Sequence, residues 1–251
     1  HLRRLNLGAL LWSIALSLTT GGICYLFLSG KLALFLHPRT WVALGLATGM
    51  LLILSMVSWR QLRSPRVYSP VGWAHTLFLL PLLLALTCPP QMLSPEVIGN
   101  KGLFGVLRGQ AINCSEHHGP LPVLALDQPI IMDEENFLQL LEDLWCNTDA
   151  YLGRDLEMLG FVYEDPALGP HDFVVARLVM TCCAADAEVA GLLCRYSERH
   201  ALTPGQWVTV RGTLAQMPYY HMAEQAVINM PYLQVREISP SEKPAQEYIY
   251  P

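Results

Sequence analysis

The residues best suited to chemistry are cysteines in the second half of the chain. Cys182 and Cys183 are adjacent, and Asp186 follows three residues later. Two thiols and a carboxylate this close together could bind a thiophilic metal ion or take part in redox chemistry. On a strand, adjacent cysteines point to opposite faces, so that one faces the core and the other is accessible. Three interpretations stay open: buried packing, a disulfide with Cys194 as the natural partner, or a soft-metal or redox site.

Other candidate ligands are weaker. Cys114 lies just before His117 and His118, and thiolate and imidazole both bind zinc or copper. Their spacing fits no closed zinc site, and a solvated histidine loop explains the same residues. Cys24 and Cys88 lie in or beside apolar segments, where we expect them to pack. Five cysteines lie beyond residue 92, and because five is odd, pairing within that region leaves at least one thiol over.

No catalytic motif accompanies these residues. The sequence contains no glycine-rich phosphate loop, no nucleophile elbow and no metalloprotease helix motif. Three consecutive acids, Asp133 to Glu135, are explained by the start of a helix, where the helix dipole favours carboxylates. We therefore expect a protein that is not an enzyme.

The segments that must position these residues divide sharply by charge. All 21 acidic residues lie beyond residue 95, whereas the first 95 residues carry seven basic ones. This partition, with long apolar runs in the acid-free part, is typical of a membrane anchor joined to an acidic, water-exposed domain. Such a domain would repel phosphate, so we exclude nucleic acid as a partner.

Three apolar runs in residues 1–92 approach the length of about 20 residues that a helix needs to cross a bilayer. They cover residues 7–28, 40–59 and 71–90. The third is marginal because it contains Pro81, which would kink it. The first is too long for a cleaved signal peptide, and two more follow it. We expect three transmembrane helices in the plasma or inner membrane.

The basic residues between the runs predict the orientation. Five lie before the first run or between the second and third, and two lie between the first and second. Because positive residues favour the cytoplasmic side, the amino terminus is predicted to lie inside. After three spans, the carboxy-terminal domain would then be extracytoplasmic. Loss of the third span would reverse this prediction.

The turn between the first two runs contains His37, Pro38 and Arg39. It fits either a proline-stiffened turn with a snorkelling arginine or a polar element at a helix or subunit interface. In the second run, Gly45 and Gly49 form a small-xxx-small pair that favours close helix packing. Three transmembrane helices are too few to form a pore on their own, so we expect a multi-span membrane partner.

Beyond residue 92 charges and turn residues become frequent. Residues 93–150 are predicted to form a connector with one short helix over 134–144, for which Asp133 is a reasonable cap. From residue 151 to 251 we expect a β domain, since five strand-like segments follow one another. These segments are 156–163, 173–182, 190–196, 207–214 and 227–238.

Two of these segments are alternating strands interrupted by a glycine, Gly160 in one and Gly212 in the other. Glycine inside a strand is typical of the tight bends of a small barrel. Five such strands in about 90 residues predict a small OB-like barrel, with a β-sandwich as the alternative.

A series of short phrases runs through nearly the whole chain. They are Leu36-His37-Pro38-Arg39, the leucine-rich run ending in Pro89-Pro90, Tyr151-Leu152-Gly153, Gly160-Phe161-Val162-Tyr163, Ala176-Arg177, Cys182-Cys183-Ala184-Ala185-Asp186-Ala187, Gln206-Trp207-Val208-Thr209-Val210-Arg211-Gly212 and the terminal Tyr248-Ile249-Tyr250-Pro251. In this order and spacing they resemble the YcgQ-like family of two-component membrane permease subunits, whose domain has unknown function. The resemblance implies a small anchored subunit that works beside a separate multi-span permease.

The chain departs from the family pattern at two places. Gln246-Glu247 precede the last motif, where the family often has further proline. The loop 115–120 is specific to this chain, so the resemblance carries over no histidine metal site.

These observations lead to one expectation: a non-enzymatic accessory subunit of a membrane permease complex, of unknown substrate. Cys182, Cys183 and Asp186 form the candidate functional segment, and the turn 37–39 is the candidate interface. No resident cofactor is expected, apart from the soft-metal ion that the cysteine segment could bind. The alternatives are a structural subunit of a larger membrane assembly without a transport role, and a thiol-redox or metal-binding membrane protein.

Overall fold

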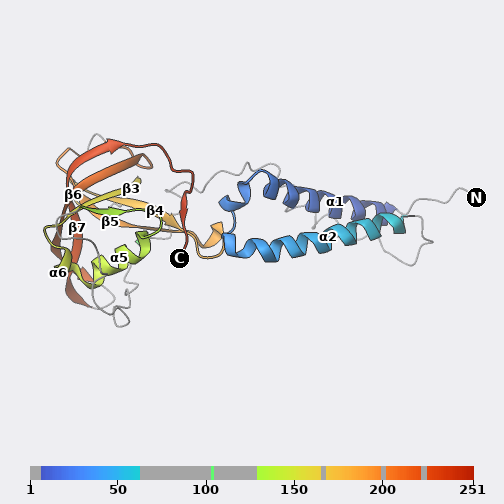
Figure 1. Cartoon of the computed structure of the whole chain (residues 1–251), viewed down its shortest axis with the longest axis horizontal. Coiled ribbons are helices and arrows are strands. Elements are labelled where there is room, and N and C mark those ends of the chain that lie inside the picture. The colour runs from blue at the N-terminus through green and yellow to red at the C-terminus, as the bar shows by residue number, and fades with distance from the viewer. Residues whose placement is uncertain (1–6, 63–102, 105–128, 165–167, 199–201, 222–224) are drawn as a thin grey trace, which may run out of the picture. The chain divides into compact units, whose positions relative to one another are not determined.

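A computed structural model describes residues 7–62, 103–104, 129–164, 168–198, 202–221 and 225–251. The chain divides into two units (Figure 1). The first consists of residues 1–92 together with 182–184, and the second contains all other residues. The third predicted span, 71–90, and the loop 115–120 with the neighbouring Cys114 lie outside the described residues.

The first unit contains two long helices, α1 (Leu7–Leu28) and α2 (Trp41–Gln61). Two short 3-10 turns, Lys31–Leu34 and Pro38–Thr40, connect them. Within the described residues, two helical segments are long and apolar enough to cross a membrane, with mean hydropathies of 1.6 and 2.0. The described part of the chain therefore holds two such helices rather than the three predicted.

The contact between α1 and α2 includes three side-chain hydrogen bonds. The hydroxyl groups of Ser13 and Ser58 are 2.7 Å apart, and those of Ser17 and Ser55 are 2.9 Å apart. The indole N–H of Trp59 donates to Ser17 Oγ at 2.8 Å. Between helices in a membrane, such hydrogen bonds contribute about 0.6 kcal/mol each and fix which helix faces meet. Serines thus form the seam of the hairpin.

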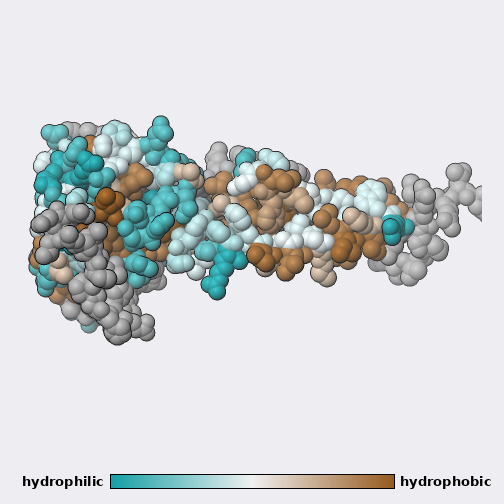
Figure 2. All heavy atoms as spheres, viewed as in Figure 1, coloured by the Kyte–Doolittle hydropathy of each residue, from teal (hydrophilic) through white to brown (hydrophobic). Residues whose placement is uncertain are grey.

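The large apolar side chains of α2 point away from this seam. Val42, Leu46 and Met50 are 74%, 75% and 66% exposed, and Figure 2 shows hydrophobic residues over the outside of the helix pair. A Cβ added at Gly45 or Gly49 would meet nothing within 4 Å, so this small-residue pair is not part of the α1–α2 contact. The buried residues of the pair are mostly small or polar (Ser13, Thr20, Thr48 and Ser55, with Ala15 and Leu16), whereas large apolar residues are exposed. This distribution is unlike that of a water-soluble helix pair and suits a lipid environment.

The second unit is a mainly-β domain with two short helices. Its helices are α5 (Phe137–Cys146) and α6 (Thr148–Tyr151), and a 3-10 turn covers Ala184–Asp186 at the boundary with the first unit. Its strands are β1 (Leu103–Phe104), β2 (Ile130–Met132), β3 (Asp155–Tyr163), β4 (Asp172–Val179), β5 (Glu188–Arg195), β6 (Trp207–His221), β7 (Ala226–Pro240) and β8 (Tyr248–Ile249).

Each of the five long strands pairs with two of the others. Strand β3 pairs with β4 and β6, β4 also pairs with β5, and β5 also pairs with β7, which returns to β6. The β5–β7 pair is parallel and the other four pairs are antiparallel. The pairings therefore run in a closed circuit, while β1, β2 and β8 add short parallel pairs to β5, β3 and β4.

The two glycines singled out in the sequence lie where neighbouring backbone comes very close. A Cβ on Gly160 would lie 2.6 Å from the carbonyl oxygen of Ala176, and a Cβ on Gly212 would lie 2.3 Å from that of Gln234. The β6–β7 register also shifts between Arg211 and Gly212. Glycine is required at both places because any side chain would collide with the adjacent strand.

The predicted helix is present but begins later than expected. Helix α5 starts at Phe137 and buries Phe137, Leu140, Leu141 and Leu144 in the core of the β domain. The prediction that Asp133 caps this helix is wrong. Its carboxylate instead accepts the backbone N–H groups of residues 135 and 136, each at 3.0 Å, in the turn that precedes α5.

The predicted strand 173–182 is too long. Strand β4 ends at Val179, so Cys182 and Cys183 lie in the following loop, and the expectation that they face opposite sides of a strand is wrong. Beyond the end of the strand, the backbone N–H of Thr181 donates to the Asp186 carboxylate at 3.2 Å.

Candidate functional sites

The loop from Cys182 to Asp186, here called the thiol loop, brings the three predicted ligands together. The sulfur atoms of Cys182 and Cys183 are 3.8 Å apart and form a thiol–thiol hydrogen bond. One ligand atom from each of Cys182, Cys183 and Asp186 lies within 4.8 Å of the others. Cys182 is exposed, whereas Cys183 and Asp186 are half-buried. This is a compact group of two soft sulfur donors and one carboxylate.

Backbone hydrogen bonds connect the thiol loop with the turn of the helical hairpin, which belongs to the same unit as residues 182–184. The N–H of His37 donates to the carbonyl oxygen of Cys182 at 3.1 Å, and the N–H of Ala184 donates to that of Phe35 at 2.9 Å. Leu36 and Cys183 thereby form an antiparallel bridge. The cysteine segment and the turn 37–39, which the sequence analysis named as separate candidates, therefore lie next to each other.

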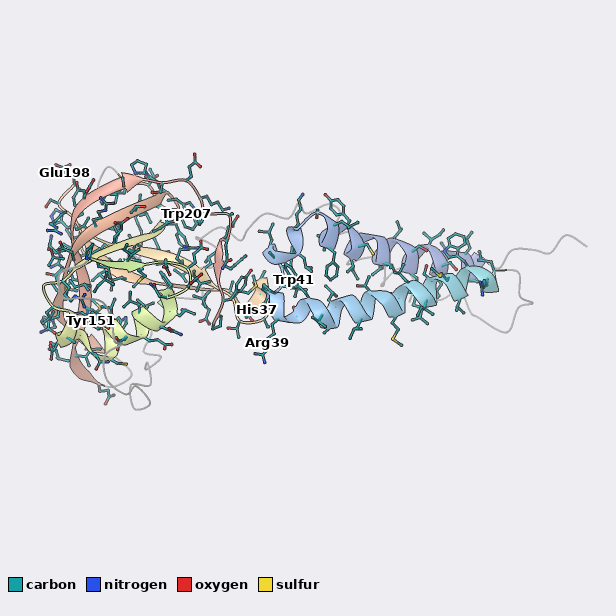
Figure 3. The ribbon with its side chains drawn as sticks, in the orientation of Figure 1. His37, Arg39, Trp41, Tyr151, Glu198 and Trp207 are labelled. Carbon is teal, nitrogen blue, oxygen red and sulfur yellow. The ribbon has the colours of Figure 1, made fainter. Side chains whose placement is uncertain are left out.

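The candidate interface turn is itself fixed by local hydrogen bonds. His37 Nδ1 accepts the backbone N–H of Arg39 at 2.9 Å, and the Thr40 hydroxyl donates to the His37 carbonyl at 2.8 Å. Pro38 begins the 3-10 turn, as its fixed φ angle favours. Figure 3 shows His37 and Arg39 at this end of the hairpin, and the Arg39 side chain is exposed.

The remaining described cysteines behave differently. Cys194 is fully buried in β5 as a free thiol, and burial raises its pKa to about 12. The expectation that it pairs with Cys182 is therefore wrong: its strand neighbours are Phe173 and Leu233, at the centre of the sheet. Cys146, at the end of α5, is disulfide-bonded.

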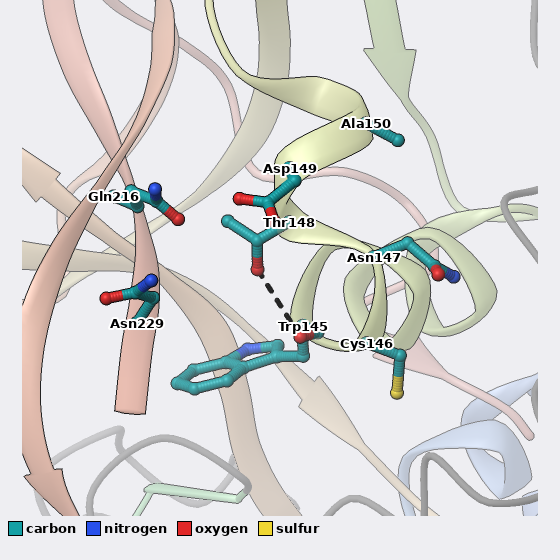
Figure 4. A pocket seen from close by; sticks show the side chains of 8 residues that line it. All are labelled: Trp145, Cys146, Asn147, Thr148, Asp149, Ala150, Gln216 and Asn229. Carbon is teal, nitrogen blue, oxygen red and sulfur yellow. Dashed lines mark hydrogen bonds between the residues drawn. The ribbon is translucent and has the colours of Figure 1, made fainter. Parts of the chain in front are cut away.

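A hollow that the sequence analysis missed lies beside α6 (Figure 4). It has a volume of about 410 Å³. Its lining comes from residues 145–150 and from one residue each of β6 and β7: Trp145, Cys146, Asn147, Thr148, Asp149, Ala150, Gln216 and Asn229. Trp145 Nε1 and Gln216 Oε1 are buried and have no hydrogen-bond partner among the described residues. The hollow combines an indole with amide, hydroxyl and carboxylate groups, which suits a small polar molecule.

A buried polar cluster underlies this hollow. The Asp143 side chain is fully buried and accepts hydrogen bonds from the Tyr151 hydroxyl and from Asn147 Nδ2, the latter at 2.6 Å. Burial and the Asp143 carboxylate raise the pKa of Tyr151, so its phenol stays protonated and keeps donating. These bonds hold α6 against the end of α5 and so fix one wall of the hollow.

A buried arginine holds the carboxy-terminal segment. Arg177 on β4 is 2% exposed, and its guanidinium carbon lies 5.3 Å from the centre of the Trp207 ring. It donates to the carbonyl oxygen of Gln246 at 2.8 Å and pairs with Glu134 at 3.2 Å. Burial lowers its pKa while Glu134 raises it. Arg177 thereby connects the β4 backbone with the segment that precedes β8, and these contacts position β8 beside β4.

Comparison with known proteins identifies the family of the β domain. Residues 116–251, more than half of the chain, match the DUF1980 C-terminal domain. The chain belongs to this family. The matched residues of the DUF1980 C-terminal domain include α5, β3 to β8, the thiol loop and the buried Arg177.

Two relatives confirm the resemblance to the YcgQ-like family. The chain is 22% identical over 200 residues to the UPF0703 protein YcgQ of Bacillus subtilis, covering 70% of this chain and 67% of that protein. It is 30% identical over 116 residues to a Streptococcus mutans protein named "Putative two-component membrane permease complex subunit". That second alignment covers 46% of this chain and 41% of the relative, so it spans less than half of either protein.

Proposed function

We propose that this chain is an accessory subunit of a membrane permease complex, anchored by α1 and α2 and carrying an extracytoplasmic, OB-like β domain. The observation that carries the proposal is the inside-out helix pair, with serines in its seam and large apolar side chains outside. The name of the Streptococcus mutans relative supports the same role. The proposal assigns no catalytic step to the chain.

The need for a partner follows from the size of the membrane part. Two helices joined by a serine seam enclose no path for a solute, and a third span over 71–90 would add little. The open face around Gly45 and Gly49 offers the close approach that small residues give to a neighbouring helix. A separate multi-span protein would supply the path, and this chain would bind at its surface.

An OB-like barrel is the fold we assign to the β domain. Its support is the circuit of pairings β3–β4–β5–β7–β6–β3, which leaves none of the five long strands as an open edge. The close backbone approaches at Gly160 and Gly212 support strongly bent strands. The role of nucleic-acid binding, common among OB-folds, does not suit this acidic domain.

The disulfide of Cys146 supports an extracytoplasmic position for the domain. Disulfides persist in oxidising compartments and are rare in the cytosol. The excess of basic residues before the first span and after the second supports the same orientation if 71–90 also crosses the membrane.

The side of the membrane can be tested with a residue that the chain already offers. Cys182 is exposed, so a membrane-impermeant maleimide should label it in intact cells. The Cys182→Ser variant controls for labelling at other thiols. Labelling that appears only after the membrane is opened would place the domain in the cytoplasm and reject this part of the proposal.

The subunit role is tested by affinity purification of the full chain in mild detergent. We expect a multi-span membrane protein to co-purify in a fixed ratio. Recovery with an unrelated membrane assembly would favour the alternative, a structural subunit without a transport role. A chain that is recovered alone from native membranes, even after cross-linking, would contradict both.

A further inference from the structure

We propose that the thiol loop is a binding site for a thiophilic divalent cation, zinc, with Cys182, Cys183 and Asp186 as its protein ligands. The inference depends on the geometry of the loop and not on the subunit role. Its strongest support is the arrangement of the three ligand atoms, two sulfurs and one carboxylate oxygen, within 4.8 Å of one another.

The separation of the two sulfurs matches that of two ligands on one zinc ion. With Zn–S bonds of about 2.3 Å and a tetrahedral angle, two thiolates on the same ion lie about 3.8 Å apart. The Cys182 and Cys183 sulfurs are 3.8 Å apart. The pair can therefore bind a cation in its present conformation, after losing its thiol protons.

Asp186 is placed to complete a three-ligand site. A Zn–O bond of about 2.0 Å would put the carboxylate oxygen about 3.5 Å from each sulfur. The ligand atoms now lie within 4.8 Å of one another, so the oxygen has to approach each sulfur by about 1.3 Å at most. Asp186 Oδ1 accepts the Thr181 N–H at 3.2 Å, which holds the carboxylate beside the two cysteines.

Three protein ligands leave one tetrahedral position for water or for a ligand from a partner. A site of this kind differs from a closed structural zinc site because the cation can be handed on. The exposure of Cys182 gives a second thiolate or a water molecule access to the bound ion. Sulfur ligands select zinc over magnesium and calcium, which prefer oxygen.

The test uses the purified full chain in detergent, mildly reduced, with the Cys146 disulfide verified by mass spectrometry. Titration with Co²⁺ should give thiolate-to-cobalt charge-transfer absorption and tetrahedral d–d bands, saturating at one ion per chain. Zn²⁺ should then displace the cobalt and abolish both signals. The readout reports coordination directly and needs no transport activity.

Three variants separate the site from other thiols. The double change Cys182→Ser with Cys183→Ser should abolish the cobalt spectrum, and Asp186→Asn should weaken binding by about tenfold or more. Cys24→Ser, which removes a thiol in α1, is the matched control and should bind like the wild type. A spectrum that persists in the double variant would overturn the proposal. The proposal would also be overturned if the reduced wild-type chain took up no ion. The same holds if Cys182 and Cys183 form a disulfide that resists reduction and the chain takes up no ion.

Discussion

Replacing Gly212 by alanine tests whether the β domain depends on the close contact between β6 and β7. The added Cβ would lie 2.3 Å from the carbonyl oxygen of Gln234 and 2.9 Å from the Cα of Val235. Both are backbone atoms, so no side chain can rotate away to make room. The two strands would have to separate where their register already shifts.

The size of the effect follows from that overlap. A carbon and an oxygen normally stay about 3.3 Å apart, so the strands must move by about 1 Å, and overpacking of this kind costs about 1–3 kcal/mol. Backbone on the opposing side places Gly212→Ala at the upper end of that range. Alanine also reduces the entropy of the unfolded chain, which offsets about 0.5 kcal/mol. The net loss of about 2.5 kcal/mol should lower Tm by about 5–10 °C.

The assay is thermal unfolding of the full chain in detergent, followed by tryptophan fluorescence and circular dichroism. Gly49→Ala is the control, because a Cβ there meets nothing within 4 Å and should leave Tm unchanged or slightly raised. If Gly212→Ala melts within about 1 °C of the wild type, or if both variants fall equally, then steric overlap with β7 does not determine the stability of this domain.

Three further predictions rest on individual side chains. Iodoacetamide should modify Cys182 in the folded, metal-free chain, whereas Cys194, buried with a pKa raised to about 12, should react only after unfolding, as peptide mass mapping can verify. Burial raises the pKa of Tyr248 from 10.0 to about 12, so its contribution to stability is fully present below pH 10 and is lost as pH rises towards 12; Tyr248→Phe should flatten that part of the alkaline unfolding curve. Arg177→Met should speed hydrogen exchange in β4 at its pairing with β8, while Glu134→Gln should change it little because Glu134 is 37% exposed.

The strands were predictable because their patterns are local. The five strand-like segments correspond to β3 to β7, since alternation of buried and exposed residues, or a continuous buried run, is visible within a few neighbours. The glycines at 160 and 212 were visible for the same reason. Strand β6 runs seven residues further than expected, to His221, because it pairs with β7 over nearly its whole length. That pairing satisfies backbone groups that the side-chain pattern does not reveal.

The hollow and the buried polar cluster could not be predicted in the same way. Gln216 and Asn229 lie 71 and 84 residues beyond Trp145 in the sequence, and they reach the wall of the hollow only because β6 and β7 lie near α6. Asp143 has the sequence context of a solvated helix residue, yet it is fully buried because Tyr151 and Asn147 supply its hydrogen bonds. In both cases the deciding partners are set by tertiary structure.

The thiol loop depends both on local sequence and on tertiary contacts, and the two contributions can be tested separately. Its residue types were visible in the sequence, but its position beside the hairpin turn depends on backbone hydrogen bonds from His37 and Ala184. These bonds use main-chain groups, so serine at positions 182 and 183 leaves them in place. Loss of cobalt binding in the double variant, with an unchanged Tm, would therefore report the loss of sulfur ligands and not the loss of the loop's structure. Loss of both together would instead show that the thiols stabilise the loop itself.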